Sequence, residues 1–271
     1  MKVLSSTMGK VYLVGAGPGD PELLTLKAAR CLGKADVVIY DRLVGRQILD
    51  LAPTVSELIN VGKKGGHYNF PQRKINQLLA GQARQGRQVV RLKGGDPFLF
   101  GRGGEEAVFL AEQNIPFEII PGVTSAVAVP ASAGIPPTHR GCASSVAIVT
   151  GHGKNYAGDP IRWEHLSKSV DTLIVLMPLR NLRHIVSQLI LHGRSLNTPS
   201  ALIESGTLET QKQVVAPLRT IVSKSIEVGI KSPALLVVGP VVNLSELLSG
   251  SYSLATVPEW PSGSLKEKLS S

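Results

Sequence analysis

The segment Lys10–Pro21 reads KVYLVGAGPGDP and passes from a short apolar run into a glycine-rich turn and then into Asp20-Pro21. The run Lys10–Gly15 has the length of a buried strand. Asp20 followed by Pro21 is typical of a helix N-terminus, with the carboxylate as N-cap and the proline at the first helical position. The segment therefore predicts a strand, a tight turn and a helix, the opening unit of an α/β sheet.

The same alternation continues through the first 120 residues. Expected strands are Lys10–Gly15, Asp36–Tyr40, Leu58–Gly62, Gln88–Leu92 and Phe117–Pro121, with helices at Glu22–Gly33, Gln72–Gly86 and Gly103–Asn114. The strands are nearly continuous in Val, Ile and Leu, which is typical of a parallel sheet buried on both faces. We therefore expect an α/β unit with right-handed crossovers.

A second alternating region follows a stretch rich in small residues and proline. Its expected strands are Ser145–Thr150, Thr172–Met177, Pro199–Glu204 and Ala234–Gly239, and its helices include Leu182–His192 and Arg219–Val228. The predicted organisation is α/β, with an N-terminal domain at 1–122, a junction at 123–141 and a C-terminal domain at 142–250. The polar tail 251–271 is expected to end disordered.

Charge and composition narrow the class of partner. The chain has 271 residues, with 29 Lys and Arg against 20 Asp and Glu, a formal net charge of +9. This surplus favours an acidic partner, which could be nucleic acid, an anionic membrane or a polyanionic small molecule. The two cysteines, Cys31 and Cys142, fit a reducing compartment better than a disulfide scaffold. No membrane span or signal-peptide core is visible, so a cytoplasmic protein is expected.

Two loops that follow strands of the first region carry candidate ligand-binding residues. Gly15–Asp20 is close to a dinucleotide fingerprint, but Asp20 stands where the third glycine is needed and where a phosphate would bind. This loop is either a tight turn or a ligand-facing loop, and Asp41 ends the next strand. The run Gly62–His67 places Lys63 and a second lysine among glycines, either as a solvated loop or as mobile cations at the same sheet edge.

The third loop, Arg91–Glu106 (RLKGGDPFLFGRGGEE), is the most informative. It has five glycines within eleven residues, a composition tolerated where backbone must approach a ligand closely. Asp96 could accept hydrogen bonds from an amine or a ribose. Arg102 and Glu105 are spaced to pair at a helix start. The alternative is an omega loop with a surface salt bridge.

Two polar residues flank the first strand of the second region. Arg140 precedes it, and His152 follows it between Gly151 and Gly153. The flanking glycines expose His152 at a strand end, although a structural histidine is an equal alternative. The histidines and cysteines show no metal-ligand spacing, so no metal is expected.

Together these motifs resemble the tetrapyrrole methylase family. The matching runs are Val11–Asp20 with Leu24–Ala28, Tyr40–Val44, Gly62–His67, Val89–Glu106, Pro121–Ala126, Gly134–Arg140, Thr150–His152, Ala201–Thr207 with Gln211, and Ser232–Val242. They keep the family's order over about residues 10 to 245. Within the family, the run Arg91–Glu106 is specific to the members that methylate uroporphyrinogen III.

The resemblance implies two α/β domains with a ligand cleft between them, and a homodimer. It implies S-adenosyl-L-methionine as donor, S-adenosyl-L-homocysteine as by-product and uroporphyrinogen III as acceptor. Methylation at carbons 2 and 7 gives precorrin-2, which feeds sirohaem and cobalamin synthesis. Because no dehydrogenase module of a sirohaem synthase precedes the motifs, the single-function form is expected. Because the sequence has no long basic tract or amphipathic anchor, neither a nucleic-acid nor a membrane partner is expected.

The resemblance also implies roles for individual residues. Donor binding falls to Pro18, Gly94, Gly95, Asp96, Leu99, Thr124, Ser125, Met177, Gly206 and Ala234. Catalytic roles fall to Asp41, Lys63, Arg102 and Glu105, and acceptor binding to Arg42, Arg140, His152 and Met177. Relatives can have Ala in place of Ser125 and Ile in place of Leu99, so Ser125 is expected to bind through its backbone and Leu99 to form an apolar wall.

The chemistry of methyl transfer suits the proposed catalytic residues to different roles. Methyl transfer to a pyrrole carbon leaves a positive ring until a proton is lost, so a general base is needed, and Asp41 is the simplest candidate. Arg102 is a poor base because guanidinium stays protonated, and it suits a carboxylate clamp fixed by Glu105. Lys63 could act as an acid or a second clamp. Among the three acidic partners that the net charge leaves open, the carboxylate-rich macrocycle implied by the resemblance is a polyanionic small molecule.

Three other functions stay open. The runs Gly62–His67 and Arg91–Glu106 disfavour a methyltransferase for a later corrinoid intermediate. A ribosomal-RNA ribose methyltransferase is disfavoured by scattered basic residues and few aromatic ones (five Phe, five Tyr and two Trp), since RNA recognition uses aromatic stacking. The complete donor motif set disfavours a non-catalytic tetrapyrrole-binding module.

Overall fold

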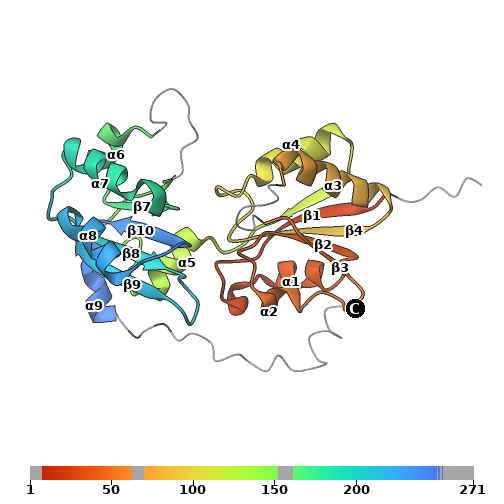
Figure 1. Cartoon of the computed structure of the whole chain (residues 1–271), viewed down its shortest axis with the longest axis horizontal. Helices are drawn as coiled ribbons and strands as arrows, with labels where there is room; N and C mark the ends of the chain where they lie inside the picture. Colours follow the sequence, from red (N-terminus) through yellow and green to blue (C-terminus); the bar gives the residue numbers. More distant parts are fainter. Residues whose placement is uncertain (1–7, 63–69, 152–160, 249, 251, 253–271) are drawn as a thin grey trace, which may run out of the picture. The chain divides into compact units, whose positions relative to one another are not determined.

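The computed structural model describes residues 8–62, 70–151, 161–248, 250 and 252, which fall into two compact units (Figure 1). The first unit runs to Thr124 and the second begins at Ser125. Each unit has its own sheet and its own apolar core. Two predicted site residues, Lys63 and His152, lie outside the described residues. No helix in the described ranges is both long and apolar enough to cross a membrane.

The first unit is a parallel five-stranded sheet in the order β3-β2-β4-β1-β5. Its elements are β1 (Lys10–Gly15), η1 (Pro21–Leu23), α1 (Leu26–Leu32), β2 (Val37–Tyr40), α2 (Arg46–Leu49), β3 (Glu57–Asn60), α3 (Gln72–Arg84), β4 (Gln88–Lys93), α4 (Gly103–Glu112) and β5 (Phe117–Ile120). Successive side chains of a strand enter opposite layers, so Leu13 packs with α3 and α4 whereas Val14 packs with α1 and α2 (Figure 1). The predicted parallel sheet, buried on both faces, is confirmed.

Capping residues set the first helix boundaries. Asp20 accepts a backbone hydrogen bond of 2.9 Å and Pro21 opens a short 3-10 helix, which confirms the predicted N-cap. The single helix expected over Glu22–Gly33 is wrong. The chain becomes extended at Thr25, whose hydroxyl accepts a hydrogen bond from the Ala28 N–H at 3.2 Å and so begins a second helix, α1.

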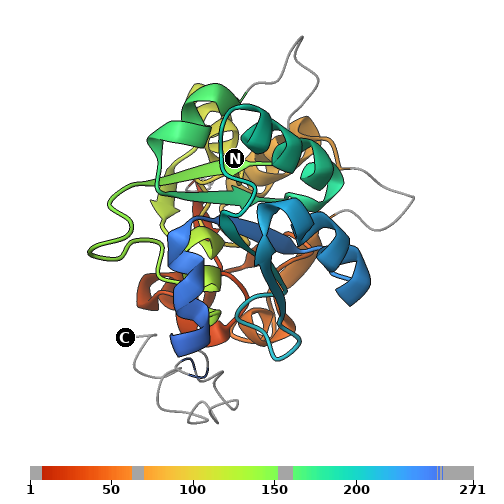
Figure 2. The same cartoon turned by 90° about the vertical axis from the view of Figure 1, so that its left-hand side faces the viewer.

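The second unit is a mixed five-stranded sheet in the order β6-β7-β10-β8-β9, in which β6 and β7 are parallel and the other neighbours antiparallel. Its elements are α5 (Ser125–Ser132), β6 (Val146–Thr150), α6 (Trp163–Ser169), β7 (Thr172–Leu176), η2 (Leu179–Asn181), α7 (Leu182–Leu191), β8 (Pro199–Glu204), β9 (Lys212–Pro217), α8 (Leu218–Val228), β10 (Ala234–Val238), η3 (Pro240–Leu244) and α9 (Ser245–Leu248). Helices α6, α7 and α8 share one apolar core with the sheet, and α5 packs against β7 and β10. Figure 2 turns this unit toward the viewer, with its helices in green, teal and blue.

Three glycines let the ends of β1, β4 and β5 pack directly on one another. A Cβ at Gly122 would lie 2.3 Å from the carbonyl oxygen of Gly95 and 2.7 Å from the Cα of Gly15. A Cβ at Gly15 would lie 2.6 Å from the same Gly95 oxygen. These distances are far below van der Waals contact, so the positions admit no side chain without a backbone shift.

We expect Gly122→Ala to lower the free energy of unfolding by about 1–3 kcal/mol, because backbone atoms must move to admit the methyl group. Gly81→Ala is the matched control, since Gly81 lies in α3 with no heavy atom within 4 Å of an added Cβ. The control should gain roughly 0.5–1 kcal/mol from the helix propensity of alanine. Urea unfolding followed by circular dichroism measures both changes, and equal stability of the two variants would contradict the close packing.

Candidate active site

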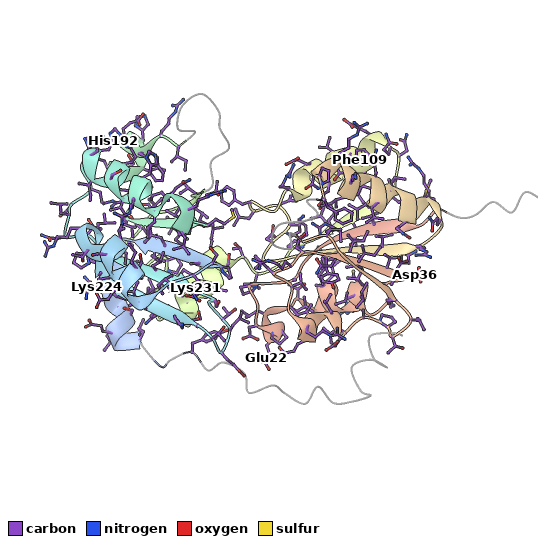
Figure 3. All side chains as sticks on the ribbon, in the orientation of Figure 1. Glu22, Asp36, Phe109, His192, Lys224 and Lys231 are labelled. Atoms are coloured by element: carbon purple, nitrogen blue, oxygen red, sulfur yellow. The ribbon has the colours of Figure 1, made fainter. Side chains whose placement is uncertain are left out.

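The predicted site residues of the first unit gather at the carboxyl edge of its parallel sheet, where α/β proteins bind ligands. Pro18 follows β1, Asp41 and Arg42 follow β2, Gly94, Gly95, Asp96 and Leu99 follow β4, and Thr124 follows β5. Figure 3 labels two residues, Glu22 and Asp36, that lie toward opposite ends of these strands. Glu22 lies just beyond the turn after β1, at this edge, and Asp36 lies at the opposite end, just before β2.

Backbone pairing fixes the first loop to the third. Gly17 and Gly95 exchange two hydrogen bonds, of 3.2 and 2.6 Å, which bring Pro18 beside the Gly94–Gly95 pair. Both paired glycines have positive φ, 77° and 68°, a conformation that favours glycine. The tight-turn interpretation of the first loop is confirmed, and its ligand-facing role stays a prediction.

The carboxylate of Asp96 forms hydrogen bonds to the chain segments that follow β4 and β5. Its Oδ1 atom accepts a hydrogen bond from the Phe98 N–H at 2.8 Å, and its Oδ2 atom accepts one from the Gly122 N–H at 3.0 Å. The carboxylate therefore shapes the glycine loop after β4 and ties it to the end of β5. Because each carboxylate oxygen has two acceptor sites, a further bond to an amine or ribose is possible and stays a prediction.

Two cationic side chains near the carboxyl end of β4 are buried inside the first unit. Arg91 and Lys93 are each 2 % exposed, and Glu106 of α4 is fully buried beside them. The Oε1 atom of Glu106 accepts hydrogen bonds from Arg91 Nε and Lys93 Nζ, both 3.0 Å long. It accepts a third, also 3.0 Å long, from Gln72 Nε2 of α3. Arg91 donates from Nη2 to Asp41 Oδ1 at 2.6 Å, so a continuous chain of charges joins α4 to Asp41 at the site edge.

Burial and neighbouring charges act in opposite directions on the two cations. Burial lowers the pKa of Lys93, and the charge of Arg91 lowers it further, against the attraction of Glu106 and Asp41. Burial would also lower the pKa of Arg91, but the charges of Glu106 and Asp41 outweigh it and raise that pKa. Arg91 lies close to the Oδ1 atom of Asp41, whereas Lys93 Nζ is 4.0 Å from the Oδ2 atom. The Oδ2 atom is therefore less closely paired with a cation than the Oδ1 atom.

Arg102 and Glu105 form the predicted pair. Arg102 Nε donates to Glu105 Oε1 at 2.8 Å and its Nη2 to Oε2 at 2.7 Å, the parallel geometry of a guanidinium with a carboxylate. This hydrogen bonding raises the pKa of Arg102, so the residue stays protonated and cannot serve as a base. Its remaining N–H groups are available to a second carboxylate. Arg102 also has φ 60°, a strained conformation that is common at functional sites.

The remaining residues of this edge are apolar or solvent-facing. Phe98 and Phe100 are 55 % and 43 % exposed, and Leu99 between them is half-buried. Arg42 is exposed, and the backbone at its position packs against Gly62, where an added Cβ would lie 2.4 Å from the Arg42 nitrogen. The third loop therefore presents aromatic surface next to its bare backbone, which suits a ligand with an apolar ring.

In the second unit, three predicted donor positions lie at one edge of the mixed sheet. Ala234 begins β10 between the ends of β7 and β8, next to the positions of Met177 and Gly206. Met177 has φ 55° and is 49 % exposed, whereas Gly206 is buried. Ser125 opens α5, which packs against β7 and β10. The structure thus brings these elements together within this unit.

Arg140 lies between α5 and β6. It is exposed in a turn closed by backbone hydrogen bonds between His139 and Ala143, and no hydrogen bond or ion pair to another described residue fixes its side chain. In the part of the chain that the structure describes, no three His, Cys, Asp or Glu side chains are placed to hold a metal ion.

Sequence reasoning gave no role to Glu106 or to the two cations that it holds. A signal was present, because Arg91 and Lys93 alternate with Leu92 inside an otherwise apolar strand. Charges at that spacing point to the same face of the sheet and need a buried counter-charge. The partner lies on a helix, so the sequence alone did not reveal it.

Comparisons with known proteins agree over most of the chain. Residues 10–222 match the family model of tetrapyrrole (corrin/porphyrin) methylases. An S-adenosyl-L-methionine-dependent uroporphyrinogen III methyltransferase of Methanosarcina barkeri is 49 % identical over 248 residues, which cover 90 % of this chain and 96 % of that protein. The uroporphyrinogen-III C-methyltransferase of Priestia megaterium is 50 % identical over 238 residues, which cover 88 % of this chain and 100 % of that protein.

A solved structure gives the same result. The uroporphyrin-III C-methyltransferase of Thermus thermophilus, complexed with S-adenosylhomocysteine, aligns with a TM-score of 0.75 at 43 % identity. The alignment covers 87 % of this chain and 100 % of that one. The fold expected from the sequence motifs, with two α/β sheets, is therefore confirmed.

We expect Glu106→Gln to lower the free energy of unfolding by about 3–5 kcal/mol, because two buried cations lose their shared counter-charge. Adding Lys93→Met to that variant removes one of these cations and should restore part of the loss. Thermal and urea unfolding of the three proteins measure the effect. A single Glu106→Gln variant as stable as the parent would show that the cluster does not depend on the Glu106 charge.

Proposed function

The chain belongs to the tetrapyrrole (corrin/porphyrin) methylase family, and we propose that it transfers methyl groups from S-adenosyl-L-methionine to uroporphyrinogen III. The observation that carries this proposal is an identity of 49 % and 50 % to two relatives named for that activity, over 96 % and 100 % of their lengths. The run Arg91–Glu106, specific to such members, supports the same activity. The chain is thus proposed to be a uroporphyrinogen-III C-methyltransferase.

The residues present fit the proposed donor, which supplies a methyl group carried on a positively charged sulfur. The adenosyl part of the donor has an aromatic ring and hydroxyl groups. In the first unit, the aromatic side chains of Phe98 and Phe100 are exposed in the glycine-rich loop after β4. In the second unit, the thioether side chain of Met177 is exposed on left-handed backbone. We propose the donor-binding set Pro18, Gly94, Gly95, Asp96, Leu99, Thr124, Ser125, Met177, Gly206 and Ala234. Gly206 is buried, so its part is to shape the backbone of its loop.

For the acceptor, we propose that Asp41 takes up the proton released from the methylated ring. Arg91 donates a hydrogen bond of 2.6 Å to the Oδ1 atom of Asp41. This bond orients the carboxylate and leaves its Oδ2 atom to accept the proton. Arg102, fixed by Glu105, is proposed as a clamp for one acceptor carboxylate. The other proposed acceptor contacts are Arg42, Lys63, Arg140, His152 and Met177.

Transfer at carbons 2 and 7 of uroporphyrinogen III gives precorrin-2, the precursor of sirohaem and cobalamin. A methyltransferase for a later corrinoid intermediate is the second candidate, since its donor site would be the same. The names of both relatives favour uroporphyrinogen III over the later intermediate. The ribosomal-RNA alternative has no comparable support.

We also propose that the protein acts in the cytoplasm as a homodimer, without nucleic acid or membrane. Two free cysteines, Cys31 and Cys142, suit a reducing compartment. The dimer follows from the family resemblance. Light scattering coupled to size-exclusion chromatography tests the dimer directly, and a monomeric mass would refute it.

Incubation with labelled S-adenosylmethionine and enzymatically generated uroporphyrinogen III tests the activity. We expect a product with the mass of two added methyl groups, because both carbons lie in similar pyrrole rings. Absence of methylated product, while a known uroporphyrinogen methyltransferase works in the same mixture, would refute the proposal. Transfer to a later corrinoid intermediate instead would favour the second candidate.

Replacing Arg102 with Lys is expected to lower kcat about a hundredfold, because lysine keeps the charge but loses the fork that orients a carboxylate. Arg87→Lys is the matched control, since Arg87 makes an ion pair with Glu57 just before β4, at the opposite end of the strands. Steady-state assays and circular dichroism compare the two folded variants. Near-normal turnover of Arg102→Lys would rule out the clamp role.

A further inference from the structure

The loop that follows β8 holds an unusual backbone conformation. Ser205 and Thr207, on either side of Gly206, have φ values of 49° and 70°, in the left-handed region. Residues with side chains rarely adopt that region, and a β-branched residue such as Thr does so least of all. Such a conformation persists only where the surrounding structure holds it in place, and it is typical of functional sites.

Gln211 supplies part of that restraint through its side-chain amide. Its Oε1 atom accepts hydrogen bonds from the Thr207 N–H and from Ser132 Oγ, both 2.8 Å long. Its Nε2 atom donates to the Ser132 carbonyl oxygen at 3.3 Å. One amide thus joins the strained loop to the end of α5, a helix that lies 79 residues earlier in the chain.

Two further contacts tie the same loop to its surroundings. Gly206 lies directly on α5, since an added Cβ would stand 2.2 Å from Val129 Cγ1. The Ser205 N–H donates to the Pro233 carbonyl oxygen at 2.9 Å, next to the start of β10 at Ala234. The loop, which carries Gly206, is therefore tied to α5 and to the start of β10, which carry the proposed donor positions Ser125 and Ala234.

A purely local role does not account for the Gln211 side chain. The turn in which Gln211 lies is already closed by the hydrogen bond from its own N–H to the Leu208 carbonyl oxygen, 2.9 Å long. Thr207 is 2 % exposed, so without the amide its N–H would lack this acceptor in a buried place. The side chain thus acts on the loop before it and not on its own turn.

We propose that Gln211 is a positioning residue for the methyl donor, because it fixes the Ser205–Thr207 loop against α5 in the shape that receives the adenosyl group. The proposal rests on the function proposed above, in which these segments bind S-adenosylmethionine. Gln211 itself makes no contact with the reacting atoms. Its loss is expected to weaken donor binding while acceptor binding and the overall fold persist.

The test compares three variants for binding of S-adenosylhomocysteine by calorimetry. Gln211→Met keeps the length of the side chain but removes the acceptor, and it should weaken binding about tenfold, as expected for a lost hydrogen bond to a buried N–H. Gln211→Glu keeps an oxygen for both donors but loses the donor to the Ser132 carbonyl oxygen, so it should lose less affinity than Gln211→Met. Gln213→Met, the same change at an exposed position of β9, should bind like the parent.

Two further measurements separate positioning from general stability. In Gln211→Met, KM for S-adenosylmethionine should rise about tenfold, with KM for uroporphyrinogen III within about twofold. Amide hydrogen exchange should increase at residues 205–207 and stay at the parent level in the strands. Unchanged donor affinity in Gln211→Met, an equal loss in Gln211→Glu, or an equal loss for the acceptor would each overturn the proposal.

The parent chain provides the reference that separates the two proposals. If the parent binds no S-adenosylhomocysteine, the proposed function fails, and the donor role of Gln211 fails with it. If the parent binds it and Gln211→Met binds it equally well, only the positioning role fails.

Discussion

Two cations on β4, Arg91 and Lys93, can lie inside the first unit because Glu106 lies opposite them on α4. A charge taken out of water is costly unless it is paired and hydrogen-bonded, and this carboxylate meets that need with a single oxygen. Its other oxygen has no hydrogen-bond partner among the described residues. Removing one member of such a buried cluster leaves an uncompensated charge, which is strongly destabilising. Arg91 extends the cluster to Asp41 and sets the orientation of that carboxylate at the sheet edge.

Backbone strain in the described residues concentrates at the ends of strands. The non-glycine residues with positive φ are Phe100, Arg102, Asn114, Met177, Ser205 and Thr207. Asn114 lies in the turn that leads into β5, and Asn tolerates this conformation, but the other residues all follow β4, β7 or β8. The family resemblance gives roles to Arg102 and Met177, and the other three residues are next to Leu99 or Gly206, which it also assigns. The regular strands and helices therefore hold these short segments in backbone conformations that non-glycine residues rarely adopt.

Much of the first unit could be predicted from its sequence because apolar runs of strand length identify a buried parallel sheet. The predicted strand Lys10–Gly15 matches β1, and the other strands differ from prediction by one or two residues at an end. Strand β9 was not predicted, because its apolar run Val214–Ala216 is only three residues long and lies between exposed Lys212 and Gln213 and Pro217. The four-residue helix α2 was missed for a similar reason, since it is too short to show a helical period.

The site was predictable as a set of motifs but not as a set of contacts. Spacing within one helix predicted the pair of Arg102 with Glu105. The bond between Arg91 and Asp41 joins residues 50 apart and depends on the register of β2 against β4, which no local pattern specifies. The same holds for Asp96, whose bond to Gly122 requires β4 and β5 to end side by side with β1.

Strand β9 is an edge strand of the second sheet, since it pairs only with β8 among the described strands. An outer strand offers unpaired N–H and C=O groups to other chains and so favours aggregation. β9 begins with a charged residue, Lys212, and ends with Pro217, which has no N–H to donate. The half-exposed Val215 between them is too isolated to form an adhesive surface. Lys212 and Pro217 therefore disfavour edge-to-edge pairing of this strand with other copies of the chain.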